Sequence, residues 1–346
     1  MLVAVAWTLV AAELFLRAFA PVPMLPRFVE PTYYGVRGNS PDMQFLHRTR
    51  DYEIQIRINK QGMRADREFT YEKPPGVTRI VVLGDSFGLG YEVDLQNTFL
   101  SRMEQRLTAA GRKVEVINLS VSGHGTAEEL LVLQNEGLRY FPDLVLLVWH
   151  ETDYQNNAES RLFRLDERGR LVREAQSYLP AEAIRAFLAR IPGYQWLSTH
   201  SQAFTFLREK GASWYKIVTR FLSGSQRYPA LDEINVAQVE YPPVVPEGEK
   251  RLALALLQRI KEESTTNGAA LLILDVPVRI SRSEFYSSFP RGDEGAPLYF
   301  NVVNPIPVFE QHEGELLYWE QSHGHFTPLA CRLVGEELAT AILTVL

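Results

Sequence analysis

The stretch that decides the fold is Arg79-Ile80-Val81-Val82-Leu83-Gly84-Asp85-Ser86-Phe87-Gly88. Four consecutive aliphatic residues (80–83) predict a buried parallel strand. The strand ends in Gly84-Asp85-Ser86, and two further glycines follow at 88 and 90. An open α/β sheet carries its reactive groups at the carboxyl ends of its strands. Ser86 is therefore a candidate nucleophile, although the Gly-x-Ser-x-Gly signature is absent.

Strands and helices alternate after this first strand. Further strands are expected at 114–119, 143–149 and 270–276, and helices at 97–111, from 126 onward and at 251–263. This alternation predicts a parallel sheet with right-handed crossovers and helices on both faces. We therefore expect one α/β domain over residues 79–346.

The alternation is interrupted between residues 158 and 245. A hairpin is expected over 162–172, turning at 166–169, and amphipathic helices are expected near 181–191 and 199–222. This insertion is a candidate lid or partner surface.

The amino-terminal residues 1–20 are apolar except for Thr8, Glu13 and Arg17. As a helix, the segment roughly matches a bilayer core of about 30 Å. Two other interpretations are a cleaved signal peptide, which Pro21 and the missing basic region disfavour, and a soluble core helix. We predict an uncleaved transmembrane anchor. Flanking Lys and Arg are too few to orient it.

Residues 21–78 are rich in proline at first and then alternate apolar with polar residues over 52–58. That alternation predicts a half-exposed strand. We interpret the segment as a membrane-proximal linker with a small β element.

Composition limits the function classes. The chain has 346 residues, of which 46% are hydrophobic and 23% charged, and its formal net charge is −6. It can bury a full core, and the absence of a basic stripe argues against nucleic-acid binding. The single cysteine, Cys331, excludes an internal disulfide and a cysteine-based structural zinc site.

Four ordered blocks make the region from about residue 79 to 346 resemble the SGNH, or GDSL-type, hydrolases. Gly84-Asp85-Ser86-Phe87 resembles their first block, and 116–126 resembles the second. Residues 143–153 resemble the third block, and His323-Gly324-His325-Phe326-Thr327-Pro328 the last. The resemblance implies a three-layer αβα fold with a flavodoxin-like parallel sheet.

The resemblance also implies roles for particular residues. Ser86 is the expected nucleophile and His325 the general base. Ser86, Gly123 and Thr152 occupy the oxyanion-hole positions, and His323 occupies the position of the acid that orients the catalytic histidine. Simpler alternatives remain, because Ser86 could cap a helix and Gly123 could serve only its turn.

Two blocks depart from the family pattern. Thr152 stands where an asparagine is expected, and His323 where an aspartate is expected. Loss of the orienting acid costs on the order of 10⁴ in turnover in a serine protease. Loss of one oxyanion donor costs about 10²–10³. Glu320 is near enough in sequence to be a substitute orienting acid. We therefore expect an impaired triad.

Two functions remain open. The first is a carboxylester hydrolase or O-acyl transferase acting on a small ester of envelope carbohydrate or lipid. It would be anchored in the cell membrane by a single pass, with its domain on the extracytoplasmic side. The second is an inactive accessory subunit of a membrane complex, docked through the anchor helix and the insertion. No cofactor is expected, and no metal, because His323 and His325 lack a clear third ligand.

Overall fold

A five-stranded parallel sheet forms the centre of the computed structural model, which describes residues 2–19, 28–174, 190–208, 210–211, 244–290 and 299–345. The strands lie in the order β13-β10-β7-β5-β6. They are β5 (Thr78–Leu83), β6 (Val114–Asn118), β7 (Leu144–Trp149), β10 (Ala270–Asp275) and β13 (Asn301–Val303). The first four are strands that the sequence predicts. The last has only three residues, too few to show a pattern.

The first strand of this sheet, β5, is a central strand with β6 on one side and β7 on the other. Numbered along the chain, the strand order is 2-1-3-4-5, which is the flavodoxin-like order. The chain reverses direction across the sheet at β5, and ligands bind at such a switch point in open α/β sheets. The fold therefore places Ser86, at the end of β5, where a site is expected.

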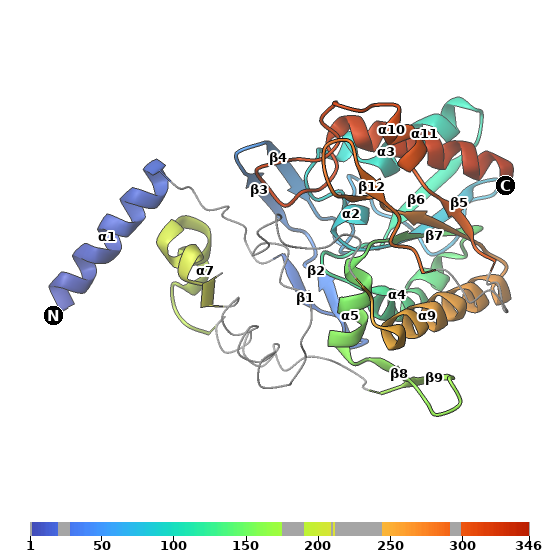
Figure 1. The fold of residues 1–346 in the computed structure, drawn as a ribbon, viewed down its shortest axis with the longest axis horizontal. Coiled ribbons are helices and arrows are strands. Elements are labelled where there is room, and N and C mark those ends of the chain that lie inside the picture. Colours follow the sequence, from blue (N-terminus) through green and yellow to red (C-terminus); the bar gives the residue numbers. More distant parts are fainter. Residues whose placement is uncertain are drawn as a thin grey trace.

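Helices cover both faces of the sheet, so the predicted three layers are confirmed (Figure 1). One layer contains α3 (Phe99–Ala109) and α11 (Pro328–Val345). The other contains α4 (Thr126–Asn135), α5 (Thr152–Ser160) and α9 (Glu247–Thr266). In β5, Ile80 and Val82 pack into the first layer while Val81 and Leu83 pack into the second. This alternation is why both faces of β5 are apolar.

Two hairpins precede the sheet. Strand β1 (Val29–Pro31) pairs with β2 (Arg37–Asn39), and β3 (Gln44–Arg48) pairs with β4 (Glu53–Arg57). The strand predicted over 52–58 is therefore confirmed. A small core joins the second hairpin to the loop that follows Ser86, through the buried side chains Phe28, Phe45, Ile54, Ile56, Ile58, Leu89 and Tyr91.

The insertion begins with the predicted hairpin, formed by β8 (Phe163–Leu165) and β9 (Leu171–Arg173). The helix predicted over 181–191 lies almost wholly outside the described residues. The helix predicted over 199–222 is described only in part. Helix α7 (Tyr194–His200) ends at the start of this range, and residues 202–208 are again helical. Most of the remaining residues of the range lie outside the described residues.

Helix α1 (Leu2–Phe19) stands apart from the sheet and its helices, beside α7 (Figure 1). Within the described ranges, we find no helix with both the length and the apolar character that crossing a membrane requires. The smaller elements are α2 (Ser86–Leu89), η1 (Leu95–Asn97), η2 (Gly137–Tyr140), β11 (Val278–Arg279), β12 (Phe285–Tyr286) and α10 (Ile306–Glu310).

Candidate active site

Ser86 is the first residue of α2, a single helical turn that starts directly after β5. Asp85 caps this turn, because its carboxylate accepts the backbone N–H of Phe87 at 2.8 Å. Gly90 ends the turn in the left-handed region, with φ of 69°, a conformation that glycine adopts most readily. The turn is so close to β6 that a Cβ on Gly88 would collide with Ser120. The glycines therefore give a tight elbow with serine at its start.

His325 reaches this elbow from the loop before α11. Its Nε2 lies 2.7 Å from Ser86 Oγ, across 239 residues of sequence. The ring also packs on Phe87, with ring centroids 4.5 Å apart. This is the distance and arrangement in which a base takes a proton from a serine hydroxyl.

The other ring nitrogen of His325 faces Glu92. Nδ1 lies 3.4 Å from Glu92 Oε2, but it is buried without a well-aligned hydrogen bond. The backbone N–H of His325 does donate to the same carboxylate oxygen, at 3.0 Å. Such contacts are commonly long in unliganded sites and shorten when substrate binds. Glu92 therefore occupies the place of an orienting acid.

The Glu92 carboxylate is fully buried and is held by several donors. Tyr52 donates its hydroxyl at 2.7 Å and His323 its backbone N–H at 3.0 Å, while the Ser322 hydroxyl lies at 3.3 Å. Burial opposes ionisation, but the His325 ring beside the carboxylate, followed by the hydrogen bonds from Tyr52 and His323, outweighs it and holds the pKa of Glu92 at about 2. The site thus carries a fixed negative charge beside His325 at neutral pH.

The loop carrying Glu92 is itself anchored from both sides. Buried Arg64 donates to the carbonyl oxygens of Leu89, Gly90 and Val93. The Trp319 indole N–H donates to the carbonyl oxygen of Glu92 at 3.1 Å. These bonds fix the backbone on either side of Glu92, and the hydrogen bonds that its carboxylate accepts fix the direction of the side chain.

The structure places His323 beside the same network. Its ring lies 6.0 Å from the ring of His47 and 6.4 Å from that of His325. Glu320, the other expected source of an acid, is paired with Arg282 at 2.6 Å and lies at the surface. Of these two positions, His323 contacts Glu92 through its backbone N–H.

The oxyanion-hole positions Gly123 and Thr152 follow β6 and β7, the two strands that flank β5. Gly123 has φ of 76°, and its carbonyl oxygen accepts from Arg37. The Thr152 hydroxyl lies 2.9 Å from Nδ1 of His150, and its backbone N–H donates toward the same nitrogen at 3.4 Å. The Thr152 hydroxyl is thus engaged with His150.

A comparison with curated proteins finds an arylesterase of Vibrio mimicus that is 36% identical to this chain over 69 residues. The match covers 20% of this chain and 34% of that protein, so the chain spans about a third of the length of this relative. This match and the contact between Ser86 and His325 indicate the same group of enzymes. The chain resembles the SGNH/GDSL-type hydrolases. No family model matches the sequence.

Solved structures similar to this chain include members of the GDSL group. TesA has a TM-score of 0.38 at 12% identity, covering 78% of this chain and 100% of that one. A lipolytic protein of the G-D-S-L family from Desulfitobacterium hafniense has a TM-score of 0.38 at 11% identity, covering 76% and 99%. One from Veillonella parvula has a TM-score of 0.38 at 12% identity, covering 78% and 100%. TM-scores of this size carry no conclusion about function.

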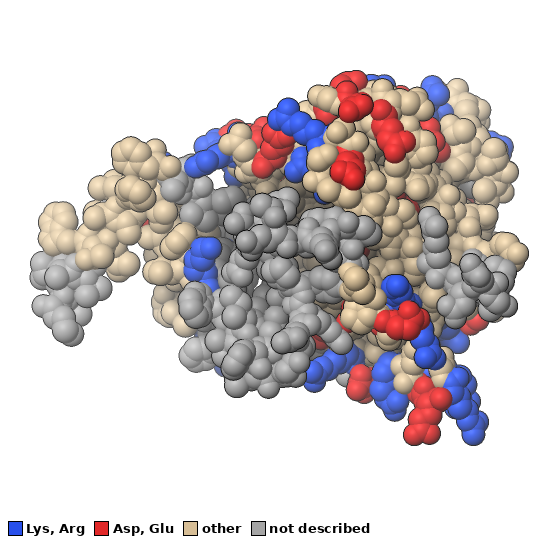
Figure 2. All heavy atoms as spheres, viewed as in Figure 1, with Lys and Arg blue, Asp and Glu red and all other residues tan. Residues whose placement is uncertain are grey.

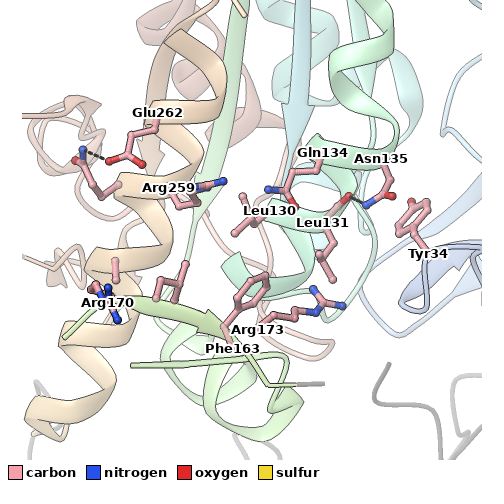
Figure 3. A pocket seen from close by; sticks show the side chains of 13 residues that line it. Tyr34, Leu130, Leu131, Gln134, Asn135, Phe163, Arg170, Arg173, Arg259 and Glu262 are labelled. Carbon is pink, nitrogen blue, oxygen red and sulfur yellow. Dashed lines mark hydrogen bonds between the residues drawn. The ribbon is translucent and has the colours of Figure 1, made fainter. Parts of the chain in front are cut away.

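A cavity of about 810 Å³ lies away from this SGNH/GDSL-type site (Figure 3). It opens between α4, α9 and the β8–β9 hairpin. Figure 3 shows Leu130, Leu131 and Phe163 on its wall together with three arginines, Arg170, Arg173 and Arg259. None of its lining residues is a serine, cysteine or histidine, so it offers no nucleophile beside a base. The volume of this cavity therefore does not identify it as the catalytic site.

Glu92, Tyr52 and Arg64 are the site residues that the sequence analysis missed. Glu92 falls outside the four blocks, six residues after Ser86, in a stretch that reads as an ordinary loop. A partial signal exists, because Glu92 stands directly between the apolar residues Tyr91 and Val93. No group of three His, Cys, Asp or Glu side chains in the described part of the chain is arranged to hold a metal ion.

Proposed function

We propose that this protein cleaves carboxylic esters through an acyl-enzyme on Ser86, with His325 as the general base. The observation that carries the proposal is the 2.7 Å contact between His325 Nε2 and Ser86 Oγ at the switch point of the sheet. Nucleophile, base and carboxylate within reach of one another are the arrangement that acyl transfer requires.

The mechanism follows from these contacts. Ser86 Oγ attacks the acyl carbon and its proton passes to Nε2 of His325. The negative charge of Glu92 stabilises the imidazolium that forms. The backbone N–H groups of Ser86 and Gly123 are the proposed donors to the oxyanion. When the tetrahedral intermediate collapses, Nε2 returns the proton to the departing alcohol oxygen. Water then attacks the acyl-enzyme with the same base, which releases the acid and restores Ser86.

The proposed triad is Ser86, His325 and Glu92, in place of one that has its acid at residue 323. An acid from another part of the chain performs the same electrostatic task, because the histidine responds to the charge and not to its position in the sequence. The remaining weakness is the oxyanion hole. The Thr152 hydroxyl is held by His150, so we propose that this third donor is impaired.

The proposed substrates are O-acyl groups of envelope carbohydrate or lipid, with transfer to a second alcohol as an alternative to hydrolysis. We also propose that residues 1–20 attach the chain to the cell membrane, with the α/β domain on the extracytoplasmic side. The apolar character of α1, with many exposed large side chains, supports this attachment.

The second candidate is a non-catalytic accessory subunit of a membrane complex. One observation favours it, namely that the Thr152 hydroxyl binds His150 instead of standing free as an oxyanion donor. Loss of one donor slows an enzyme by about 10²–10³ but does not abolish its chemistry. The ester-cleaving function therefore remains the proposal.

Labelling with a fluorophosphonate probe separates the two candidates. Ser86 should be labelled in the natural chain, and p-nitrophenyl acetate should be hydrolysed. Both signals should disappear in Ser86→Ala and in His325→Ala, while Ser281→Ala, on an exposed loop, should match the natural chain. A folded natural chain that neither labels nor hydrolyses the ester would favour the accessory function.

A further inference from the structure

Helix α1 contains two charged side chains, Glu13 and Arg17, which form an ion pair at 2.6 Å. They are the only charges in an otherwise apolar helix. Both also reach residues of the insertion, more than 180 positions away in sequence. The pair is therefore part of a contact between α1 and the insertion.

Glu13 binds the start of the helical segment 202–208. Its carboxylate accepts the Ser201 hydroxyl at 2.9 Å and the backbone N–H groups of Gln202 and Ala203 at 3.1 and 2.8 Å. The first N–H groups of a helix have no partner within the helix, and a carboxylate is the best acceptor for them. Glu13 thus acts as a helix cap from another helix.

Arg17 binds the end of the preceding helix. Its Nη2 donates to the carbonyl oxygen of His200, the last residue of α7, at 2.6 Å. A cation there satisfies a free carbonyl group and complements the negative end of the helix dipole. Each charge of α1 therefore meets the helix end of opposite sign. We call α1, α7 and residues 201–208 the helical unit.

The outer surface of the helical unit is apolar. Among the described residues, 21 large hydrophobic side chains are exposed, and 11 of them lie in this unit or at Ile191 just before α7: Trp7, Leu9, Val10, Leu14, Phe15, Phe19, Ile191, Trp196, Leu197, Phe206 and Leu207. Figure 2 shows α1 as a projection nearly free of charge, whereas Lys, Arg, Asp and Glu gather on the β8–β9 hairpin and over the α10–α11 side. Single exposed apolar residues scattered over a surface are normal in soluble proteins. Here they are concentrated in one unit and form a much larger apolar surface.

We infer that the helical unit binds a lipid bilayer surface as one body, with the insertion helices inserted beside α1. The two charged side chains of α1, Glu13 and Arg17, pair with each other and with the helix ends, and such pairing lowers the cost of placing them in a medium with little water. Exposed tryptophan and phenylalanine are the side chains that favour the membrane interface. The inference goes beyond ester cleavage and extends the proposed membrane attachment from residues 1–20 to the insertion.

Quenching of tryptophan fluorescence by brominated lipid tests this inference in the full chain. The chain is mixed with vesicles of phosphatidylcholine and phosphatidylglycerol, and the quenched signal is compared with that of Trp7→Phe and of Trp196→Phe. We expect each substitution to remove part of the quenched signal. If only Trp7→Phe removes it, α1 binds lipid without the insertion and the inference is overturned. If neither does, the proposed membrane attachment fails as well.

Substitution of Glu13 tests the coupling. Glu13→Leu keeps α1 apolar but removes the cap, so quenching through Trp196 should be lost while quenching through Trp7 remains. The matched control is Glu53→Leu, which breaks the exposed Arg48–Glu53 pair on the β3–β4 hairpin and should change neither signal. Far-UV circular dichroism checks that the variants are folded. Unchanged quenching through Trp196 in a folded Glu13→Leu variant would refute the coupling. A stable dimer in lipid-free solution that shields Trp196 would mean that the apolar surface binds a second copy of the chain and not lipid.

Discussion

Glu92 Oε2 lies 3.4 Å from Nδ1 of His325, although Glu92 follows Ser86 by only six residues. The nucleophile and the acid therefore come from one short segment, and only the histidine arrives from a distant part of the chain. The order along the chain, serine then acid then histidine, is the same as in a triad with its acid at residue 323, but here the acid lies close to the serine in sequence and not close to the histidine.

Glu92→Gln should lower kcat/KM for p-nitrophenyl acetate by about 10⁴, because the imidazolium loses its neighbouring negative charge. Glu92→Asp should restore part of the activity. Glu320→Gln is the control, since that side chain is held at the surface by Arg282 and its loss should leave the rate unchanged. If Glu92→Gln and Glu320→Gln lowered kcat/KM equally, Glu92 would not be the acid of the triad.

Thr152→Asn should raise kcat, by at most about 10²–10³, because the longer amide can serve as an oxyanion donor. Thr152→Val, which has no hydroxyl, should not raise it. The gain should be absent in the background of Ser86→Ala. Steady-state kinetics with a small activated ester measure the effect, and a fall in kcat for a folded Thr152→Asn would mean that the Thr152–His150 contact has a catalytic use.

Gly88→Ala should destabilise the fold by roughly 1–3 kcal/mol and lower activity, because the new Cβ would overlap Ser120 and displace the elbow that carries Ser86. Gly248→Ala in α9 is a matched change in open space, with no atom within 4 Å of the added Cβ, and should be neutral or mildly stabilising. Urea denaturation compares the two. A Gly88→Ala variant as stable as the natural chain would show that the elbow can expand.

Glu128→Gln should flatten the dependence of folding stability on pH. Burial raises the pKa of Glu128 to about 7, from an ordinary value of 4.5. The folded state thus holds this proton more tightly than the unfolded state, so the stability it provides is present below pH 4.5 and is lost as the pH rises through about 7. Denaturation at pH 5 and pH 8 should show a smaller loss in Glu128→Gln than in the natural chain. Identical losses would mean that Glu128 does not titrate in this range.

Sequence pattern was sufficient for the layers and most of the sheet. The runs at 80–83, 114–119, 143–149 and 270–276 are long and apolar, and such strands have few alternatives in a chain that also shows helical periodicity. The short strand β13 was missed, because three residues show no period. Turn signals were enough to predict the β8–β9 hairpin.

The acid of the site was not predictable in the same way. The blocks identify residues by position in a pattern, and the pattern puts an acid at residue 323. Glu92 becomes an acid of the site only when the β3–β4 hairpin brings Tyr52 beside it and the last loop brings His323 and His325. Those contacts span up to 233 residues, and no local pattern encodes them. Likewise, Glu13 and Arg17 look like interruptions of an apolar segment until their partners are known.

Glu92 accepts backbone hydrogen bonds from His323 and His325, so the proposed site is complete only when the loop that carries these two residues has docked. A folding intermediate in which β5, α2 and the following loop have formed, but the last loop has not docked, contains a carboxylate at an interior position without two of its principal donors. A buried carboxylate without these donors costs free energy. Docking of the last loop supplies the donors and also brings His325 to Ser86. In the proposed mechanism, the loop that supplies these two donors to Glu92 therefore also supplies the base for Ser86, so a chain whose last loop has not docked lacks that base.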